Sequence, residues 1–535
     1  MIAQFVSKIC EYPEPYIHYA HHAQYDWRHI LPWLVEHEIP VEICMRTETD
    51  IYEVRLKIGP VEVIMRDSMA FWNGSLAQLA KAYCPEMPKG DIDFAGGEIF
   101  DPDNPEHEAY ARRDAAILAV ALPRLNTKMQ RHFGVSIAPT TAGTAVRAWQ
   151  ETLGENEYYE CAKNDGLEHF AREAYYGGLV FLTRNDRIGD GSGEVADTFD
   201  INSSYPAQML KYGVPYGRVR PTLNFKTNKP GIFRVRVFAP ESLIVPILPR
   251  RNDRGAMTWS RGEFETVVTN FELQFAIQHG YEVLQVIEGV EWDKIIFPFS
   301  AFIKKCRAIR FEYKGLAEEM LAKLMQNSLY GKFGSRRIRT KIFHPQDDEE
   351  KIGAQPLDET EYFWVKQEES EDMKCMPHWA VFITANARLT LLRNVYAVGP
   401  QNVLYGDTDS ITILSGHRDK IDVGDEYGQF KLEKSWSEFR AIAPKVYVGK
   451  LWGGDKHGTF KGAAKGLPKK AMNNDKWNEL LETSATTAGA LSLTSLRVAM
   501  QKGAKPAHQM TRKSSSLNNS ANWELHGNLV RPKMA

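Results

Sequence analysis

The stretch Tyr405-Gly406-Asp407-Thr408-Asp409-Ser410 is set between the apolar runs at 402–404 and 411–414. Strand-forming residues around a glycine and a pair of carboxylates predict the tip of a β-hairpin. Because side chains alternate along a strand, Asp407 and Asp409 are expected to project to the same face. Carboxylates this close repel each other, so a cation must offset them. A divalent metal that carries a triphosphate is one candidate, and an ordinary acidic turn at a sheet edge is the alternative.

A second carboxylate motif favours a metal site over an ordinary acidic turn. Residues 200–206 read Asp-Ile-Asn-Ser-Ser-Tyr-Pro and follow a strand-like run at 195–199. A carboxylate that ends a strand, before a turn and Tyr205-Pro206, puts Asp200 where a second strand would meet the hairpin. The motif therefore makes a plain acidic turn the weaker interpretation.

A third motif, at 323–331, reads Lys-Leu-Met-Gln-Asn-Ser-Leu-Tyr-Gly. The surrounding residues 316–330 are rich in Ala, Leu, Glu, Lys and Met, which predicts a helix. On a helix, Lys323, Asn327 and Tyr330 are spaced i, i+4 and i+7 and share one face. A cation, an amide and an aromatic ring on one stripe suit a triphosphate and a stacked base. The stripe alone would be equally typical of a solvated helix face.

Taken in this order, the three motifs resemble those of family B DNA polymerases, which read D-x-x-S-x-Y-P, K-x-x-x-N-S-x-Y-G and Y-x-D-T-D-S. Lys445-Val446-Tyr447 resembles the K-x-Y motif of that family, and Tyr175-Tyr176-Gly177-Gly178 resembles its Y-x-G-G motif. Within the family, the chain looks most like the protein-primed branch of phages and linear plasmids. The matches are scattered from residue 19 to residue 466.

The resemblance implies a multidomain α/β fold. An RNase H-like, exonuclease-type domain is followed by a right-hand polymerase of palm, fingers and thumb with two insertions. The implied boundaries are an exonuclease-like domain at 1–134, palm at 135–211 and 377–472, a first insertion for the priming protein and DNA at 212–298, fingers at 299–334, a second insertion for processivity at 335–376, and thumb at 473–535.

The resemblance also implies roles for individual residues. Asp200, Asp407 and Asp409 would hold two Mg²⁺ ions, with Mn²⁺ as an alternative, and Lys323 would contact the triphosphate. Tyr205 would exclude a ribose 2′-hydroxyl, and Tyr330 would pack beside the base. The other implied nucleotide-binding residues are Ser203, Ser204 and Asn327; the implied DNA-binding residues are Tyr175, Gly177, Gly178, Thr408, Lys445, Tyr447, Lys461 and Lys465.

The N-terminal part resembles a proofreading 3′–5′ exonuclease in two of its three acidic motifs. Asp26 ends a match to the second motif, in which His22 stands where an asparagine is usual, and Tyr110 and Asp114 match the third. Further matches place Lys89 as a catalytic lysine and Ser75-Leu76 as a contact to single-stranded DNA. The first motif, D-x-E, is expected some tens of residues before Asp26, where only 25 residues are present. Either the chain is shortened or the site lacks half its metal ligands, so excision is expected to be weak or absent.

Length and composition agree with a soluble enzyme of several domains. The 535 residues exceed a single core, and 43% hydrophobic with 25% charged residues is ordinary for globular proteins. No apolar run is long enough to span a membrane, so no membrane partner is expected. Six widely spaced cysteines predict reduced thiols and a cytoplasmic location, in a host cell if the chain is viral.

Charge is distributed unevenly along the chain. Residues 445–470 carry seven lysines against Asp455 alone, and residues 502–533 carry six lysines and arginines against Glu524 alone. These stretches predict contacts to DNA phosphates, with solvated surface as the alternative. The acidic stretch 346–374 is expected to face solvent or a basic partner. The implied partners are therefore a DNA primer–template, deoxynucleotides and a terminal protein that serves as primer, bound to a monomer.

Three rival functions remain at this point. A primer-independent family B polymerase would start chains from a nucleotide, and the two insertions do not exclude it. A catalytically inactive DNA-binding remnant is suggested by the missing D-x-E but disfavoured by the intact polymerase carboxylates. A reverse transcriptase is disfavoured because its hairpin normally reads Y-x-D-D.

Overall fold

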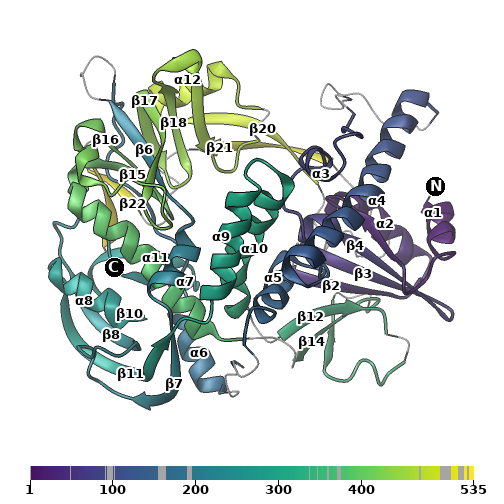
Figure 1. The fold of residues 1–535 in the computed structure, drawn as a ribbon, viewed down its shortest axis with the longest axis horizontal. Coiled ribbons are helices and arrows are strands. Elements are labelled where there is room, and N and C mark those ends of the chain that lie inside the picture. Colours follow the sequence, from purple (N-terminus) through teal and green to yellow (C-terminus); the bar gives the residue numbers. More distant parts are fainter. Residues whose placement is uncertain are drawn as a thin grey trace. The chain divides into compact units, whose positions relative to one another are not determined.

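A computed structural model shows the fold of the chain (Figure 1). The residues that it describes are 2–47, 50–90, 92, 101, 103–154, 159, 164–189, 195–335, 338–345, 347–357, 361–369, 375–468, 471–493, 508–515, 523–526 and 529–534. The chain divides into two compact units. The first unit comprises 1–159, 301–375 and 492–509, and the second comprises 160–300, 376–491 and 510–535.

The first unit is built on a seven-stranded sheet with strand order β1-β4-β3-β2-β12-β14-β13. Its strands are β1 (Ile17–Ala20), β2 (Val41–Thr47), β3 (Asp50–Ile58), β4 (Val61–Asp67), β12 (Ile338–Phe343), β13 (Ala354–Pro356) and β14 (Trp364–Glu369). β1 runs parallel to β4, whereas β2, β3 and β4 form an antiparallel meander. The three strands from the predicted second insertion continue this sheet, because β12 pairs with β2.

Helices of the first unit bury apolar stripes. They are α1 (Ile2–Ile9), α2 (Gln24–Glu36), α3 (Leu76–Tyr83), α4 (Pro105–Phe133), α5 (Thr141–Gln150), α9 (Ser300–Glu312) and α10 (Ala317–Phe333). On α2, Trp27, Leu31 and Leu34 recur at helical spacing and are almost fully buried in one core with Val54 of the sheet. α5 and α10 contact each other, and the rings of Trp149 and Phe333 meet edge to face at 5.3 Å.

The second unit contains a seven-stranded sheet, of order β19-β18-β17-β6-β16-β15-β5, that carries the carboxylate motifs. The strands are β5 (Val180–Leu182), β6 (Ala196–Ile201), β15 (Val403–Asp407), β16 (Ser410–Leu414), β17 (Phe430–Ala443), β18 (Val446–Leu451) and β19 (Phe460–Ala464). α7 (Ser204–Lys211) follows β6, and α12 (Asn474–Thr483) follows β19. A sheet of this order brings β6 next to β16 although more than two hundred residues separate them.

A further sheet of the second unit has the order β22-β23-β10-β8-β11-β7, with β9 paired to β10. Its strands are β7 (Val214–Pro221), β8 (Gly231–Ala239), β9 (Pro249–Arg251), β10 (Met257–Thr269), β11 (Glu282–Ile296), β22 (Trp523–His526) and β23 (Leu529–Met534). The last of these, β23, runs parallel to β10. Arg261 of β10 fixes that strand by donating to the carbonyl oxygen of Pro532 at 2.6 Å. β20 (Thr486–Leu493) and β21 (His508–Ser515) form a separate pair.

α11 (Pro377–Val398) packs against strands of both large sheets in the second unit (Figure 1). It is buried on nearly every face, as expected for a helix that is apolar all round. Leu391, Leu392 and Val395 join one continuous core with residues of both sheets. α8 (Asn270–Gln278) and α6 (Asp165–Glu173) lie against α11.

The local sequence predictions agree with these elements. The expected strands at 51–56, 61–65, 195–199 and 233–237 lie essentially within β3, β4, β6 and β8. The expected helices at 114–125 and 316–330 correspond to parts of α4 and α10. Within the described part of the chain, no helix has the length and apolar character required to cross a membrane. Asp347, Asp348 and Glu349 are exposed, as expected for the acidic stretch, whereas Lys469, Lys470, Lys502 and Lys505 lie outside the described residues.

Candidate active site

The predicted hairpin is confirmed as β15 and β16, joined by the two-residue turn Thr408-Asp409. Asp407 pairs with Ser410 across the turn, and Thr408 adopts a left-handed backbone with φ of 61°. Asp409 lies in the turn rather than on a strand, so strand alternation does not determine the direction of its side chain. The tight turn brings both carboxylates to the same pocket instead.

Asp200 lies on β6, directly beside the turn. It pairs with Ser410 on one side and with Lys431 of β17 on the other, and its side chain is half-buried. The amide of the next residue, Ile201, donates to the carbonyl oxygen of Asp409 at 2.7 Å. The prediction that the strand carrying Asp200 meets the hairpin is therefore confirmed.

A pocket of about 360 Å³ opens at the turn. Its walls come from five strands, β6, β15, β16, β17 and β18, and from two of the connections between them: Thr198, Tyr405, Asp407, Thr408, Asp409, Ser410, Thr412, Glu433, Lys445 and Tyr447. Burial, with the neighbouring Asp407 charge as a further cause, raises the pKa of Asp409 above its ordinary value. The pocket is thus a negative site in which ionised Asp409 is disfavoured unless a cation is near.

Lys445 supplies such a cation in this structure. Its Nζ lies 2.9 and 3.0 Å from the two carboxylate oxygens of Asp407. Its backbone N–H donates to the Tyr405 hydroxyl at 2.9 Å, and its φ of 63° is left-handed. The hydroxyl of Thr408 donates to Asp407 at 3.0 Å, so the carboxylate is held on several sides. The rings of Tyr405 and Tyr447 pack 5.2 Å apart beside it.

The segment Tyr175-Tyr176-Gly177-Gly178 lies against the carboxylate turn. A Cβ added at Gly178 would come within 2.6 Å of the Thr408 side chain, so only glycine permits this approach. The amide of Thr408 donates to the carbonyl oxygen of Leu179 at 2.8 Å. Gly177 is exposed and Tyr175 is half-buried. The Y-x-G-G match thus belongs to the same local structure as Asp407 and Asp409.

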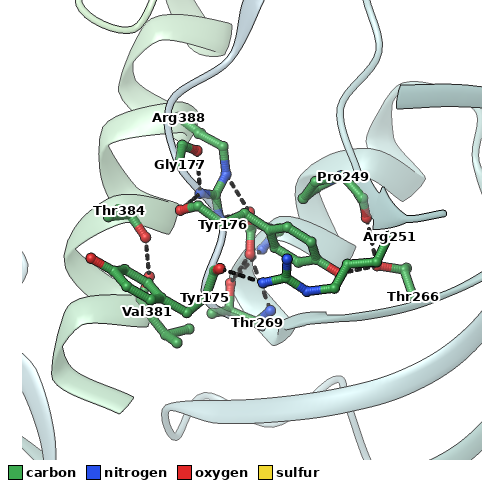
Figure 2. Close-up of polar contacts among 11 residues, drawn as sticks. Tyr175, Tyr176, Gly177, Pro249, Arg251, Thr266, Thr269, Val381, Thr384 and Arg388 are labelled. Carbon is green, nitrogen blue, oxygen red and sulfur yellow. Dashed lines mark hydrogen bonds and ion pairs between the residues drawn. The ribbon is translucent and has the colours of Figure 1, made fainter. Parts of the chain in front are cut away.

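Arg388 of α11 binds this segment, and the sequence analysis did not identify it (Figure 2). Its guanidinium donates to the carbonyl oxygens of Tyr176 at 2.8 Å and Gly177 at 2.9 Å. The same group pairs with Glu272 at 2.7 Å, and both side chains are almost fully buried. An arginine inside an otherwise apolar helical stretch was the available signal, since buried charges require partners.

Arg251 of β9 binds the same segment from another side (Figure 2). It donates to the carbonyl oxygen of Tyr175 at 2.8 Å and lies 5.0 Å from the centre of the Tyr176 ring. Carbonyls of Tyr175, Tyr176 and Gly177 are therefore all bound by arginine side chains. Backbone groups held this way are pre-positioned relative to the turn that they contact.

The predicted nucleotide-binding residues fall in both units. In the second unit, Ser203 has a left-handed backbone with φ of 50° and precedes α7. Ser204 is buried, and its hydroxyl oxygen has no hydrogen-bond partner among the described residues. Tyr205, in the first turn of α7, is half-buried. In the first unit, Lys323 and Asn327 are exposed on α10 and Tyr330 is half-buried there, as the helical spacing predicts.

Of the remaining predicted DNA contacts, two lysines are exposed, whereas Ser75 and Leu76 take part in the structure of α3. Lys461 on β19 and Lys465 just after it are exposed, and the backbone N–H of Lys465 donates to the carbonyl oxygen of Lys445. Ser75 caps α3 through a reciprocal pair of hydrogen bonds with Gln78, and Leu76 is buried. Ser75 therefore stabilises the start of α3, and Leu76 packs in the core beneath it.

Three of the four exonuclease-like residues, Lys89, Tyr110 and Asp114, contact one another in the first unit. Lys89 lies 2.8 Å from Asp114 and also contacts the Tyr110 hydroxyl. The other Asp114 oxygen is buried and has no hydrogen-bond partner in the described part of the chain. Burial raises the pKa of Asp26, and the charge of Asp67 raises it further. The structure therefore brings the predicted residues Tyr110 and Asp114 into contact with the predicted Lys89.

Asp67, at the end of β4, was not predicted as part of this group. Its carboxylate accepts from the backbone N–H of His22 at 3.0 Å and of Met69 at 2.9 Å. Its place opposite Ala20, where β1 pairs with β4, could not be read from either strand alone. Across the described residues, no three histidine, cysteine or carboxylate side chains converge as a ready metal cluster, here or at the polymerase-type turn.

Comparison with known proteins identifies the family. The family model described as "DNA polymerase type B, organellar and viral" matches residues 10–101 and 104–398. The DNA polymerase of Bacillus phage Nf is 26% identical over 505 residues, which cover 83% of this chain and 80% of that protein. The DNA polymerase of Bacillus phage phi29 is 27% identical over 433 residues, with 76% and 69% covered.

A solved structure has the same fold. The phi29 DNA polymerase complexed with primer–template DNA and incoming nucleotide substrates superposes with a TM-score of 0.73 at 20% identity, covering 97% of this chain and 93% of that one. The matched region spans more than half of the sequence and contains two of the three motifs, those at 200–206 and 323–331. This chain therefore belongs to the type B DNA polymerases of organelles and viruses, a family of DNA-directed DNA polymerases.

Proposed function

We propose that this chain extends a 3′-hydroxyl on a DNA template by transferring deoxynucleotides, and that it replicates a phage or linear mobile element from a protein primer. The observation that carries the proposal is the Asp407-Thr408-Asp409 turn, packed beside Asp200 and against Gly178. Similarity to phage polymerases, including one seen with primer–template and nucleotides, supports the assignment to this chain.

The donor set at the turn fits a hard divalent cation. Asp200, Asp407 and Asp409 offer carboxylate oxygens, which Mg²⁺ prefers, and Mn²⁺ would accept the same ligands. Family B polymerases generally use divalent metals, which would activate the 3′-hydroxyl and neutralise the triphosphate. Lys445 must release Asp407 before that carboxylate can serve as a ligand, because it now binds both oxygens. We propose that Lys445 then turns to the primer strand with Tyr447.

Residues on α7 and residues on α10 are each proposed to bind the nucleotide. Lys323 is proposed to bind the triphosphate and to stabilise charge on the leaving pyrophosphate, as a positioned cation does in phosphoryl transfer. Asn327 and Tyr330 follow it along the same helix face, where the tyrosine ring would pack beside the base. Ser203 and Ser204, whose hydroxyl has no partner among the residues that the structure describes, are proposed to face the phosphates and sugar.

The domain assignments from the resemblance are proposed unchanged. The exonuclease-like domain is 1–134, the palm 135–211 with 377–472, the fingers 299–334 and the thumb 473–535. The insertions 212–298 and 335–376 are proposed to contact the terminal protein and to confer processivity. Tyr175, Gly177, Gly178, Thr408, Lys461, Lys465, Ser75 and Leu76 complete the proposed DNA contacts. The enzyme is proposed to act as a monomer in the cytoplasm of its host.

A primer-extension assay tests the proposed activity. The purified chain should extend a labelled primer on a longer template when Mg²⁺ and deoxynucleotides are present, and should stop when chelator is added. Without primer or terminal protein, the same template should yield no product. Synthesis under the second condition would instead favour a primer-independent polymerase, and inactivity under the first would favour a DNA-binding remnant.

Sugar discrimination is expected to depend on Tyr205. Its ring, at the start of α7, is proposed to fill the volume that a 2′-hydroxyl needs, so Tyr205→Val should raise ribonucleotide relative to deoxyribonucleotide insertion about tenfold or more. Tyr205→Phe is the matched control, since it keeps the ring and should keep the discrimination. The ratio of the two kcat/KM values measures the effect. An unchanged ratio in Tyr205→Val would exclude Tyr205 as the steric gate.

Proofreading by this 535-residue chain is expected to be weak. Asp114 is already paired with Lys89, and Asp26 and Asp67 add too few carboxylates for a two-metal site. Excision of a mismatched 3′-end should be slower than extension of a matched end by about a hundredfold or more. Asp114→Ala should change that excision rate little. Vigorous excision that disappears in Asp114→Ala would show that other residues complete the metal site.

A further inference from the structure

A second pocket, of about 290 Å³, lies in the second unit between the end of α7, the start of β7, α8 and α11. None of the residues assigned to polymerisation lines it. Three phenylalanines form much of its wall: Phe271 and Phe275 from α8, and Phe382 from α11. The rings of Phe271 and Phe382 meet edge to face at 6.0 Å. Such walls suit a flat, aromatic ligand.

A buried amide points into this aromatic pocket. Asn386 lies one helical turn after Phe382 on α11, lines the pocket and is only 5% exposed. Its side chain makes no hydrogen bond to any part of the chain that the structure describes. An amide that lines a pocket and has no partner in the described part of the chain is free to pair with a ligand there.

The mouth of the pocket is cationic. Arg393, two turns further along α11, is exposed and donates to the Tyr212 hydroxyl at 2.9 Å. Lys211 lies 5.5 Å from the centre of the same Tyr212 ring. The residues that line the pocket include no carboxylate to offset Arg393. An anionic group at the rim would therefore be attracted, and guanidinium binds phosphate through paired hydrogen bonds.

We propose that this pocket binds an adenine nucleotide outside the polymerising centre. The base lies against the phenylalanine rings, the Asn386 amide pairs with its edge, and the phosphate meets Arg393. Asparagine matches adenine because it can donate to and accept from the same base edge. The pocket volume is near the lower limit for ligand sites, which fits a base inside and a phosphate at the mouth. The nucleotide is either free in solution or an unpaired residue of a DNA strand.

Calorimetric titration of the full chain with AMP in the presence of EDTA tests this assignment. Without a metal, a monophosphate has little affinity for the polymerising centre, and Asp409→Asn should bind AMP as the unaltered chain does. Asn386→Leu and Arg393→Gln should each raise the Kd for AMP about tenfold, because each removes a hydrogen-bonding partner of the nucleotide. Phe275→Trp should block binding by filling the pocket. Arg393 is exposed, so its substitution leaves the fold intact even if Asn386→Leu is unstable.

A second titration, with a five-residue deoxyadenosine oligonucleotide, separates the two sources. Binding of AMP with the expected sensitivity to both substitutions supports a site for free nucleotides. Binding of the oligonucleotide alone, with the same sensitivity, supports capture of an unpaired base. Failure of both probes to bind, or binding that neither Arg393→Gln nor Phe275→Trp weakens, overturns the proposal. These outcomes do not depend on incorporation, so they are independent of whether the chain polymerises DNA.

Discussion

Asp409→Asn and Asp200→Asn are each expected to lower nucleotide incorporation by about a thousandfold or more. Both carboxylates are proposed metal ligands, and charge stabilisation of several kcal/mol by a metal corresponds to that factor in rate. The pKa of Asp409 is raised by burial and by Asp407, so the folded chain disfavours its ionised form. Asp409→Asn should therefore leave stability unchanged or slightly increased while activity is lost.

Single-turnover incorporation with saturating Mg²⁺, together with urea unfolding, measures both effects. Asp419→Asn is a matched control, because Asp419 is an exposed carboxylate in the same unit and outside the pocket. Primer–template affinity should be largely retained in both active-site variants. Near-normal incorporation by either variant would show that the turn is not the metal site.

Arg388→Met is expected to produce the largest loss of stability. It would leave Glu272 charged and buried, and would strip the carbonyl oxygens of Tyr176 and Gly177 of their donor. Breaking a buried ion pair by removing one partner costs about 3–5 kcal/mol. Because the freed segment contacts Thr408, incorporation should also fall in molecules that remain folded.

The double variant Arg388→Met with Glu272→Gln is the control for charge. Glutamine keeps the capping of α8 that Glu272 provides to Thr269, but carries no charge. Urea unfolding should show the double variant to be more stable than Arg388→Met alone, since no unpaired charge stays buried. If the single variant unfolds at the same urea concentration as the unaltered chain, the pair does not stabilise the fold.

Local periodicity was sufficient to predict the carboxylate hairpin, the strand before Asp200 and the helix of Lys323. Each depends on residues within a few positions of one another, so propensity and spacing describe it. Lys445 and Asp407 are 38 residues apart, and Arg388 and Glu272 are 116 apart. Such pairs are decided by which strands and helices become neighbours, and a single sequence carries no direct signal of that choice. Asp67 was missed for the same reason, because only the pairing of β1 with β4 makes it a neighbour of His22.

The insertion at 335–376 is a second case in which the sequence did not predict which strands pair. Its strands are ordinary in composition, but β12 pairs with β2 and continues the N-terminal sheet. Nothing within Ile338–Phe343 specifies that partner, since any exposed strand edge offers the same backbone groups. At the Asp409 turn the sequence predicted the right residues but not the backbone conformation that positions them. There the motif was recognised, but the backbone that places the second carboxylate is a tight turn with a left-handed Thr408.

The parallel pairing of β23 with β10 has a consequence for synthesis of the protein. A ribosome translates β10 long before β23, so in nascent chains Ser260 and Arg261 of β10 lack their eventual partners, Lys533 and Met534. An unpaired edge is a template for strands of other chains. Pairing at such a large sequence separation is also slow to form, because chain entropy opposes it. Nascent chains should therefore be more prone to aggregate than the complete fold until β23 has been translated.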